Sequence, residues 1–385
     1  MSTLYSRFAT LAALAFAVSS LIVGCGGSGG DQKDEPDEPS VDEVAFARGA
    51  DVSWASEMEY DMTHNPSRIG GTAFKDSKGN AGLYPVLKAA GINAIRLRVW
   101  VKPEDPNGWS GKDDVVRMAK RAAEAGMAVM IDFHYSDFFA DPSRQNTPSE
   151  WSGLDLNGLC AKVAEHTRDV LTALKSAGVT PLWVQVGNET RPGMLWETGR
   201  LYNDKGEISG GWSNYAALSN AGYDAVKSVF PAAKVIVHID NAYQDNTWFF
   251  DKLKAAGGKF DMIGLSHYPM TNPSMTWKAM NSSAILNIKS LAAKYGCRVM
   301  VCEVGVKNTA SDLAASTLCM TEFMNSVKSL SVCAGVFYWE PQVDGKWRPA
   351  IYERPDRDWG PYNMGAFSSD GSAITPTAIL SAFGE

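Results

Sequence analysis

The most constraining feature of this sequence is a regular alternation of short β-branched runs with longer amphipathic stretches, which continues from residue 48 almost to the end. Several runs are nearly continuous in apolar residues, as strands buried on both faces are. Glycine often follows an amphipathic stretch, as at Gly91, Gly126, Gly178 and Gly296, where a helix normally stops. The expected strands are 48–54, 93–99, 127–133, 182–188, 234–239, 261–266, 298–303 and 335–339. The expected helices are 83–90, 113–125, 156–177, 213–229, 247–256, 283–295, 313–327 and 376–383.

This alternation of eight strands with eight helices predicts an α/β protein with a single (β/α)8 TIM barrel. The alternative is an open, doubly wound sheet, which would require a phosphate-binding glycine loop after the first strand. Residues 50–54 contain no glycine, so the barrel is favoured. No linker rich in Pro, Gly or Ser interrupts the chain after residue 45, so we expect residues 45–385 to form one catalytic barrel.

The first 44 residues are typical of an export signal and a tether rather than of a folded domain. Arg7 precedes an apolar run at 11–23 that is short for a membrane span, and the segment 22–25, Ile-Val-Gly-Cys, resembles a bacterial lipobox. We therefore expect a lipoprotein signal peptide at 1–24 and, at 25–44, a lipidated Cys25 with a flexible acidic tether. The alternative is a plain secretory signal with an incidental cysteine. The acidity after Cys25 resembles the surface-export signal of Bacteroidetes lipoproteins, which predicts an outer-membrane lipoprotein at the cell surface.

Charge and composition limit the possible partners. The net charge is −7, so a nucleic acid is not an expected partner. Part of that charge lies in the tether, and the nearly neutral remainder suits an uncharged substrate. Nothing in the sequence requires more than a monomer attached to the membrane by its lipid. Five cysteines in the folded part fit no zinc spacing and are expected as buried small side chains, although one disulfide stays possible. They are Cys160, Cys297, Cys302, Cys319 and Cys333.

Polar or charged residues stand at the carboxyl ends of all eight expected strands, where (β/α)8 enzymes gather their catalytic groups. Packing alone does not explain such a pattern. His134, His238 and His267 raise the possibility of zinc, but they lie on three different strands, so we expect hydrogen bonds to sugar, no metal and no cofactor. The strand-end residues are Asp51, Arg96, Arg98, Asp132, His134, Gln185, Asn188, Glu189, His238, Asp240, Ser266, His267, Tyr268, Glu303, Trp339 and Glu340.

Two of these carboxyl groups fit a retaining glycoside hydrolase, which needs a pair about 5–5.5 Å apart. The fourth and seventh strands can place Glu189 and Glu303 across the barrel mouth, and Asn188 can bond a sugar 2-hydroxyl. We expect Arg98 to keep Glu303 ionised, and Glu303 with the apolar mouth to raise the pKa of Glu189. Taken alone, Asn188-Glu189 is compatible with a turn and Glu303 with a buried ion pair. Their combination favours catalysis.

Seven motifs occur in a fixed order along the chain: GADVS at 49–53, IRLRVWV at 95–101, DFHYSD at 132–137, ADP at 140–142, WVQVGNE at 183–189, GMLW at 193–196 and DMIGLS at 261–266. Together they resemble glycoside hydrolase family 53, the endo-β-1,4-galactanases, from about residue 47 onward. The resemblance implies Glu189 as acid/base, Glu303 as nucleophile, and the β-1,4-galactan of pectin as the substrate. It also implies a subsite for the cleaved sugar that is lined by Asp51, Arg98, His134, Asn188, His238, Tyr268 and Trp339.

Some segments depart from the family pattern. Residues 270–272 and 304–307 lack the usual aromatic residues, and the long acidic loop that binds calcium in some relatives is missing after the seventh strand. These departures affect outlying subsites rather than catalysis. Glu340 is expected as an ion-pair partner, and the aromatic residues of the loop 347–359 as either a sugar platform or packing. The remaining alternatives are a mannanase or glucanase of the same clan, and a non-catalytic glycan-binding surface lipoprotein.

Overall fold

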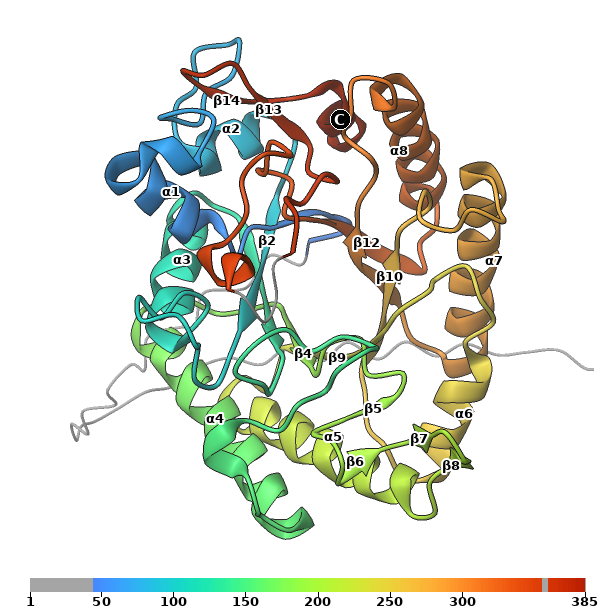
Figure 1. Cartoon of the computed structure of the whole chain (residues 1–385). Helices are drawn as coiled ribbons and strands as arrows, with labels where there is room; N and C mark the ends of the chain where they lie inside the picture. Colours follow the sequence, from blue (N-terminus) through green and yellow to red (C-terminus); the bar gives the residue numbers. More distant parts are fainter. Residues whose placement is uncertain (1–43, 355–358, 385) are drawn as a thin grey trace, which may run out of the picture. The chain divides into compact units, whose positions relative to one another are not determined.

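The computed structural model describes residues 44–354 and 359–384, so the expected signal peptide, Cys25 and the tether up to residue 43 lie outside it. Eight parallel strands close into a barrel in the order β1-β12-β11-β10-β9-β4-β3-β2, which confirms the predicted (β/α)8 fold (Figure 1). Within these residues no helix has the length and apolar character needed to cross a bilayer. The barrel strands are β1 (Ala47–Asp51), β2 (Ala94–Val99), β3 (Ala128–Phe133), β4 (Trp183–Val186), β9 (Lys234–Ile239), β10 (Met262–His267), β11 (Val299–Val304) and β12 (Cys333–Trp339).

Seven of the eight expected helices are present and surround the barrel (Figure 1). Most start within two residues of the prediction, but α7 starts six residues early because the Thr276 hydroxyl caps it, accepting from the N–H of Ala279. Two hairpins follow β4, formed by β5 (Gly193–Met194) with β6 (Gly199–Arg200) and by β7 (Tyr202–Asn203) with β8 (Gly206–Glu207). The seven helices are α2 (Leu83–Ala89), α3 (Lys112–Glu124), α4 (Leu156–Ser176), α5 (Gly211–Val229), α6 (Thr247–Ala255), α7 (Trp277–Tyr295) and α8 (Leu313–Lys328).

Two elements differ from the expectation. The final segment is not an α-helix: Pro376 ends β14 (Ile374–Pro376), which pairs with β13 (Phe367–Ser369), and only Ala378–Phe383 follows, as a 3-10 helix. The sequence pattern also missed α1 (Ala55–His64). This helix buries two carboxylates, Glu57 and Asp61, beside Ala55, Met58 and Met62, so its buried face mixes charged and apolar side chains and gives a weak periodicity signal.

The barrel has an inner and an outer core. The outer cluster lies between strands and helices, whereas the inner one fills the barrel with small and large side chains from alternating strand positions. Two interior glycines make room for larger neighbours. A Cβ at Gly49 would lie 2.2 Å from the ring of Phe337, and one at Gly264 would lie 2.7 Å from Cys302 Sγ. The inner cluster consists of Ala47, Ala94, Met130, Trp183, Ile236, Met262, Met300, Cys302, Ala334 and Phe337.

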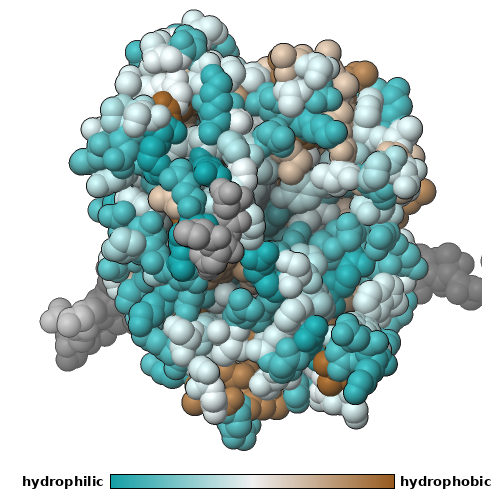
Figure 2. All heavy atoms as spheres, in the orientation of Figure 1, coloured by the Kyte–Doolittle hydropathy of each residue, from teal (hydrophilic) through white to brown (hydrophobic). Residues whose placement is uncertain are grey.

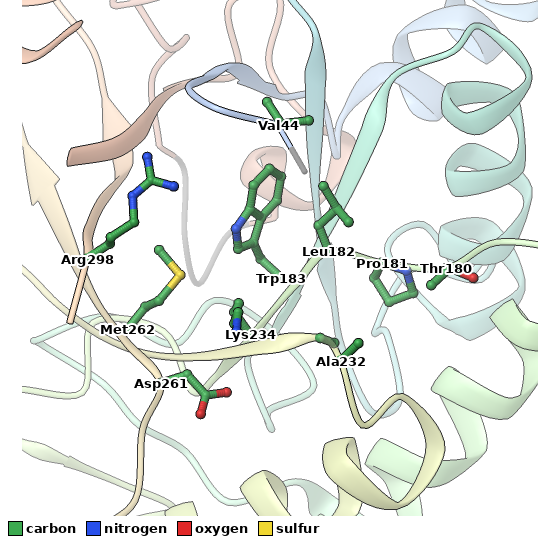
Figure 3. Close-up of a pocket in the computed structure, with 11 residues that line it drawn as sticks. Val44, Thr180, Pro181, Leu182, Trp183, Ala232, Lys234, Asp261, Met262 and Arg298 are labelled. Atoms are coloured by element: carbon green, nitrogen blue, oxygen red, sulfur yellow. The ribbon is translucent and has the colours of Figure 1, made fainter. Parts of the chain in front are cut away.

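A cavity of about 590 Å³ opens at the amino ends of the strands, with Trp183, Met262 and Arg298 among its lining residues (Figure 3). Trp183 and Met262 are the first residues of β4 and β10, so this cavity lies at the end of the barrel opposite the strand-end polar residues. In (β/α)8 enzymes the amino-terminal end serves stability and the carboxyl end serves catalysis. Size alone is therefore a poor guide to the active site here.

Candidate active site

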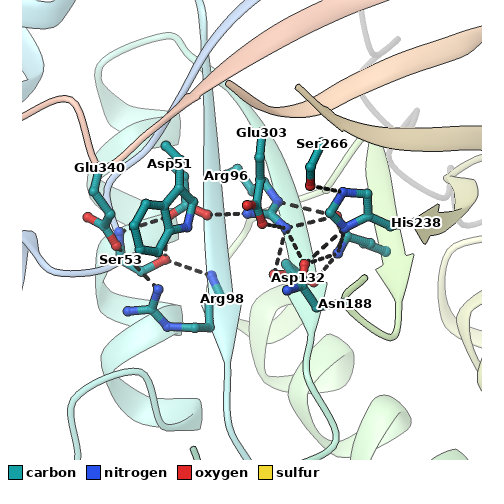
Figure 4. A network of polar contacts seen from close by, with 12 residues as sticks. Asp51, Ser53, Arg96, Arg98, Asp132, Asn188, His238, Ser266, Glu303 and Glu340 are labelled. Atoms are coloured by element: carbon teal, nitrogen blue, oxygen red, sulfur yellow. Dashed lines mark hydrogen bonds and ion pairs between the residues drawn. The ribbon is translucent and has the colours of Figure 1, made fainter. Parts of the chain in front are cut away.

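A single network of polar contacts at the carboxyl ends of the strands includes residues from, or directly after, all eight barrel strands (Figure 4). Many of the strand-end residues that the sequence singled out therefore converge in space, whereas His267 bonds to Asn281 and packs against Phe323. The network includes Asp51, Ser53, Arg96, Arg98, Asp132, Asn188, His238, Ser266, Glu303 and Glu340.

Arg96 is the centre of this network and is completely buried. Its guanidinium contacts three carboxylates: Asp51 at 2.6 Å, Asp132 at 2.8 Å and Glu303 at 3.1 Å. The same group also donates to the amide oxygens of Gln185 at 3.0 Å and Asn188 at 2.9 Å. Each of the three guanidinium nitrogens thus has an acceptor, and the positive charge is surrounded by negative charge.

The expectation that Arg98 lies beside Glu303 is wrong. Arg98 pairs instead with Glu340 at 3.3 Å, and the rings of Trp100 and Phe139 lie 4.9 and 4.6 Å from its guanidinium carbon. The physical reason is that residues two apart on a strand share a face, so both arginines point inward. Which one reaches β11 depends on the strand register, which the sequence pattern does not contain.

Glu303 reaches Arg96 because β11 contains a bulge. Pairing with β10 passes from Leu265–Val301 directly to Ser266–Glu303, so one residue of β11, Cys302, has no opposite partner. Cys302 faces the barrel interior, and simple alternation would turn the next side chain outward. The extra residue allows Cys302 and Glu303 both to face inward.

Two groups beside Glu303 stabilise its ionised form. The hydroxyl of Tyr268 donates to Oε2 at 2.8 Å, and Arg96 contacts the other oxygen. Burial raises the pKa of Glu303, and the charge of Arg96 and the Tyr268 hydrogen bond oppose that rise.

Glu189 has different surroundings. Burial raises its pKa well above the ordinary value, and the negative charges of Glu303 and Asp240 raise it further. A hydrogen bond from Ser266 opposes these effects only in part. The negative charge of Glu303 is thus one of the causes that raise the pKa of Glu189. The pKa of Glu189 is raised well above its ordinary value, and that of Glu303 is raised less.

Two histidines in the network are neutral. Burial lowers the pKa of His134, whose Nδ1 accepts from the N–H of Ala140 at 2.9 Å, which leaves Nε2 to donate to Asp132. Burial also lowers the pKa of His238, which contacts Asn188 through Nδ1 and Ser266 through Nε2, each at 2.9 Å. His238 thereby links Asn188, the residue before Glu189, to the hydroxyl of Ser266.

The seven predicted sugar-contacting residues differ in exposure. Tyr268 and Trp339 are only partly buried. Asp51, Arg98, His134, Asn188 and His238 are at most 5% exposed. Each of these five bonds to other protein groups.

Gln185 is the main functional candidate to which the sequence analysis gave no role, although it named the residue as one at a strand end. Its Nε2 lies 2.5 Å from Asp132 Oδ1 and 2.9 Å from Asn188 Oδ1, and its Oε1 accepts from Arg96. One buried amide thus connects the neighbours of both Glu189 and Glu303. It stands four residues before Glu189 at a strand end, so its position was visible, but its partners were not.

The loop after β12 mostly packs rather than exposing its aromatic residues. Trp347 is fully buried and its Nε1 donates to Asp61 at 2.9 Å, and Tyr352 is only 8% exposed. Tyr362 is partly buried, and its ring lies edge-on to Trp339 at 4.8 Å. Tyr362, absent from the sequence prediction, thus fixes the ring of Trp339.

Backbone strain concentrates around the site. Four non-glycine residues that follow barrel strands have φ between 48° and 57°, a region that side chains disfavour. Such residues cluster at functional sites, where surrounding contacts hold them. They are Tyr135, Glu189, Asn241 and Glu340.

Within the described residues, no group of three or more His, Cys, Asp or Glu side chains is arranged to hold a metal ion. The five cysteines of the folded part are all free, so the possible disulfide is not formed there.

Comparisons with known proteins agree with this geometry. The sequence profile described as "Glycosyl hydrolase family 53" matches residues 47–366. A Thermothelomyces thermophilus protein named arabinogalactan endo-beta-1,4-galactanase is 36% identical over 295 residues, 70% of this chain and 84% of that protein. A Bacillus subtilis protein named endo-beta-1,4-galactanase is 30% identical over 360 residues, 86% of this chain and 78% of that protein.

Solved structures share the fold over nearly the same length. A structure described as a fungal beta-1,4-galactanase superposes with a TM-score of 0.71 at 31% identity, covering 88% of this chain and 98% of that chain. A catalytic domain from Ignisphaera aggregans superposes with a TM-score of 0.72 at 26% identity, covering 89% and 96%.

Proposed function

The chain belongs to glycosyl hydrolase family 53, and from that premise we propose that it is a retaining endo-β-1,4-galactanase with Glu303 as nucleophile and Glu189 as acid/base. The observation that carries the proposal is the contrast between the two carboxyl groups. Arg96 and Tyr268 stabilise negative charge on Glu303, whereas burial and neighbouring negative charges raise the pKa of Glu189 well above its ordinary value. This is the division that double displacement at an anomeric carbon requires.

In the first step the Glu303 carboxylate attacks the anomeric carbon while Glu189 gives its proton to the departing glycosidic oxygen. The bond to the leaving sugar breaks and an ester to Glu303 forms. In the second step Glu189, now ionised, takes a proton from water as the water attacks the same carbon. The ester breaks, Glu303 is released as carboxylate, and Glu189 is protonated again. Two inversions give net retention.

The other residues have supporting roles in this proposal. Asn188 and Tyr268 lie beside the two carboxyl groups, where they can meet the hydroxyl groups of the cleaved sugar. Trp339, held by Tyr362, offers its partly exposed ring to a sugar face. Asp51, Arg98, His134 and His238 act through the buried network. Galactan is proposed as the substrate because the related proteins are named galactanases.

A polysaccharide panel with reducing-sugar detection tests the proposal. Linear β-1,4-galactan should be hydrolysed, with β-mannan and β-glucan unaffected. Mid-length oligosaccharides at early times indicate internal cleavage, and steady release of one short product contradicts it. Hydrolysis of mannan but not galactan would reject the substrate, and no hydrolysis with retained binding would support a non-catalytic glycan receptor.

Two variants test the catalytic assignment. Glu303→Ala should bind galactan but lose nearly all hydrolysis. Glu189→Ala should be rescued by azide on substrates with good leaving groups, because this variant still forms the glycosyl ester. Unchanged turnover by Glu303→Ala rejects the nucleophile.

We also propose that the protein is exported and anchored to the outer membrane through Cys25, with the barrel at the cell surface. The lipobox-like residues 22–25 and the acidic stretch after them support this. Radiolabelled palmitate should label the wild type but not Cys25→Ser. Protease added to intact cells should cleave the barrel, and full protection would contradict surface exposure.

A further inference from the structure

A second group of aromatic side chains lies outside the strand-end network, where β7 and β8 lie beside α6 at the edge of the barrel (Figure 1). The ring centroids of Tyr202 and Trp248 are 6.2 Å apart, and Trp212 lies 6.4 Å from each of them. Glu207 on β8 forms an ion pair with Lys252 on α6, one helical turn after Trp248. We call these five residues the hairpin surface.

Trp248 is the exposed member of this surface. It is 36% exposed, and among the exposed large hydrophobic residues that the structure describes it is the aromatic one, the others being leucines. Most of the visible face of the molecule is hydrophilic, with hydrophobic patches at its lower edge and upper right (Figure 2). An exposed indole backed by other rings is held in place, so binding a ligand on it costs little side-chain entropy.

A cavity of about 340 Å³ adjoins these rings, at the beginning of α5, with Glu207 and Trp212 among its lining residues. Trp212 is 8% exposed, and its indole N–H is directed at Glu207 and Tyr202, which fixes the ring behind Trp248. The cavity is therefore bordered by a rigid aromatic ring and by a carboxylate that accepts hydrogen bonds. A sugar hydroxyl is a suitable donor to such a carboxylate.

The charge of the hairpin surface also limits the ligand. Lys252 neutralises Glu207, whose carboxylate lines the cavity and can accept a hydrogen bond there. A phosphate or a polyanion would require unbalanced positive charge. Flat aromatic faces and a neutralised carboxylate fit the C–H faces and hydroxyl groups of an uncharged polysaccharide.

We propose that the hairpin surface is a second glycan-binding site, which holds a segment of the same uncharged polysaccharide that the barrel mouth cleaves. The identity of that polysaccharide rests on the proposed galactanase function. Two sites on one long chain make the second contact intramolecular, so the hairpin surface raises the concentration of polymer at the cleft. Short substrates cannot reach both sites and gain nothing from it.

The binding test uses the full chain in the Glu303→Ala background, so that polymer is not degraded. Trp248→Ala is compared with Leu286→Ala, a 66% exposed side chain on α7, in affinity electrophoresis with linear β-1,4-galactan. We expect Trp248→Ala to weaken the apparent affinity for polymer about tenfold, and Leu286→Ala to leave it unchanged. Equal affinities of the two variants would overturn the proposal.

A second measurement separates binding from folding and from the proposed activity. With Glu303 intact, Trp248→Ala should hydrolyse a short aryl-glycoside as the wild type does, but act several-fold more slowly on long galactan at low concentration. Trp248→Tyr, which keeps a flat ring, should restore the rate on long galactan. An equal loss on short and long substrates would overturn the proposal. If the wild type cleaves no galactan, the galactanase function fails instead, and the two failures are distinguishable.

Discussion

Arg96 and Arg98 lie two residues apart on β2 and both point into the barrel, but their surroundings differ completely. Arg96 contacts three carboxylates and two amide oxygens. Arg98 has a single ion-pair partner, Glu340, and its Nε and Nη2 are without hydrogen-bond partners among the described residues. Aromatic rings occupy the space around it instead.

The difference shows two ways of burying a guanidinium. Around Arg96 the desolvation cost is offset by charge and complete hydrogen bonding, which makes the group a fixed source of positive potential beside Glu303. Around Arg98 the π faces of Trp54, Trp100 and Phe139 provide part of the compensation. Only the first arrangement acts on a reacting carboxylate. The arrangement around Arg98 instead stabilises the packing of the surrounding loops.

Removing each arginine is the strongest test of this comparison. Arg96→Met leaves three carboxylates without their cation, so we expect kcat/KM to fall by roughly 10³-fold or more and the free energy of unfolding by about 3–5 kcal/mol. Arg98→Met should lower both kcat/KM and the free energy of unfolding by less, because Glu340 can stay protonated.

Urea unfolding and galactan kinetics measure both effects. Arg96→Lys, which keeps the charge, serves as the variant that folds if Arg96→Met does not. Equal losses of kcat/KM in the Arg96 and Arg98 variants would refute the distinction.

Glu340→Gln tests the charge state of the Arg98 pair. Burial raises the pKa of Glu340 to about 8 from 4.5, so its contribution to stability is present below 4.5 and is lost as the pH rises through 8. Gln does not titrate. The stability of the wild type relative to Glu340→Gln should therefore fall between pH 5 and 8, by at most about 5 kcal/mol.

Urea unfolding of both proteins at pH 5, 6.5 and 8 measures that difference. A difference that stays constant from pH 5 to pH 8 would mean that Glu340 is already ionised in the folded protein and forms a full salt bridge with Arg98.

Tyr268→Phe tests how the Glu303 carboxylate, which Arg96 contacts, is stabilised. It removes the hydroxyl that donates to Glu303 at 2.8 Å and lowers its pKa. Without that bond the pKa of Glu303 rises, so the low-pH limb of kcat/KM should move to higher pH, and kcat should fall about tenfold. A pH–rate profile is the measurement. A shift of the high-pH limb alone would mean that Tyr268 acts on Glu189.

Phe139→Leu has the smallest expected effect. It removes a ring 4.6 Å from the Arg98 guanidinium but keeps an apolar side chain, so we expect a loss of about 1–2 kcal/mol of stability. Activity should change little. The same substitution at Phe138, which does not contact Arg98 through its ring, is the matched control in thermal unfolding. Equal losses would indicate that packing alone matters.

The barrel was predictable because its signal is local. Strand β9 has the predicted bounds, 234–239, since a run of buried β-branched residues needs no tertiary knowledge to recognise. Helix α1 was missed for the opposite reason, because Glu57 and Asp61 are buried by partners far away in the chain, such as Ala350 and Trp347. Local patterns cannot reveal a carboxylate whose partner lies about 290 residues later.

The site was predictable only in part. Its members could be chosen because they stand at strand ends, but their pairings depend on strand register. Arg96 and Arg98 share one face of β2, so alternation alone could not assign Glu303 to one of them. The role of Gln185 could not be predicted either, because it depends entirely on the partners of its amide on β2, β3 and β9.

The bulge in β11 has a consequence for anyone who redesigns this barrel. If β11 paired regularly with its neighbours, Glu303 and Val304 would exchange sides, leaving a valine in the cleft and a carboxylate against the helices. The direction of the Glu303 side chain is thus decided by backbone hydrogen bonds from β10 and β12, although Glu303 itself lies on β11. A chimera that takes β10 or β12 from another barrel must keep a strand that pairs with the bulged β11. Otherwise it will fold into an inactive protein in which every catalytic residue is present.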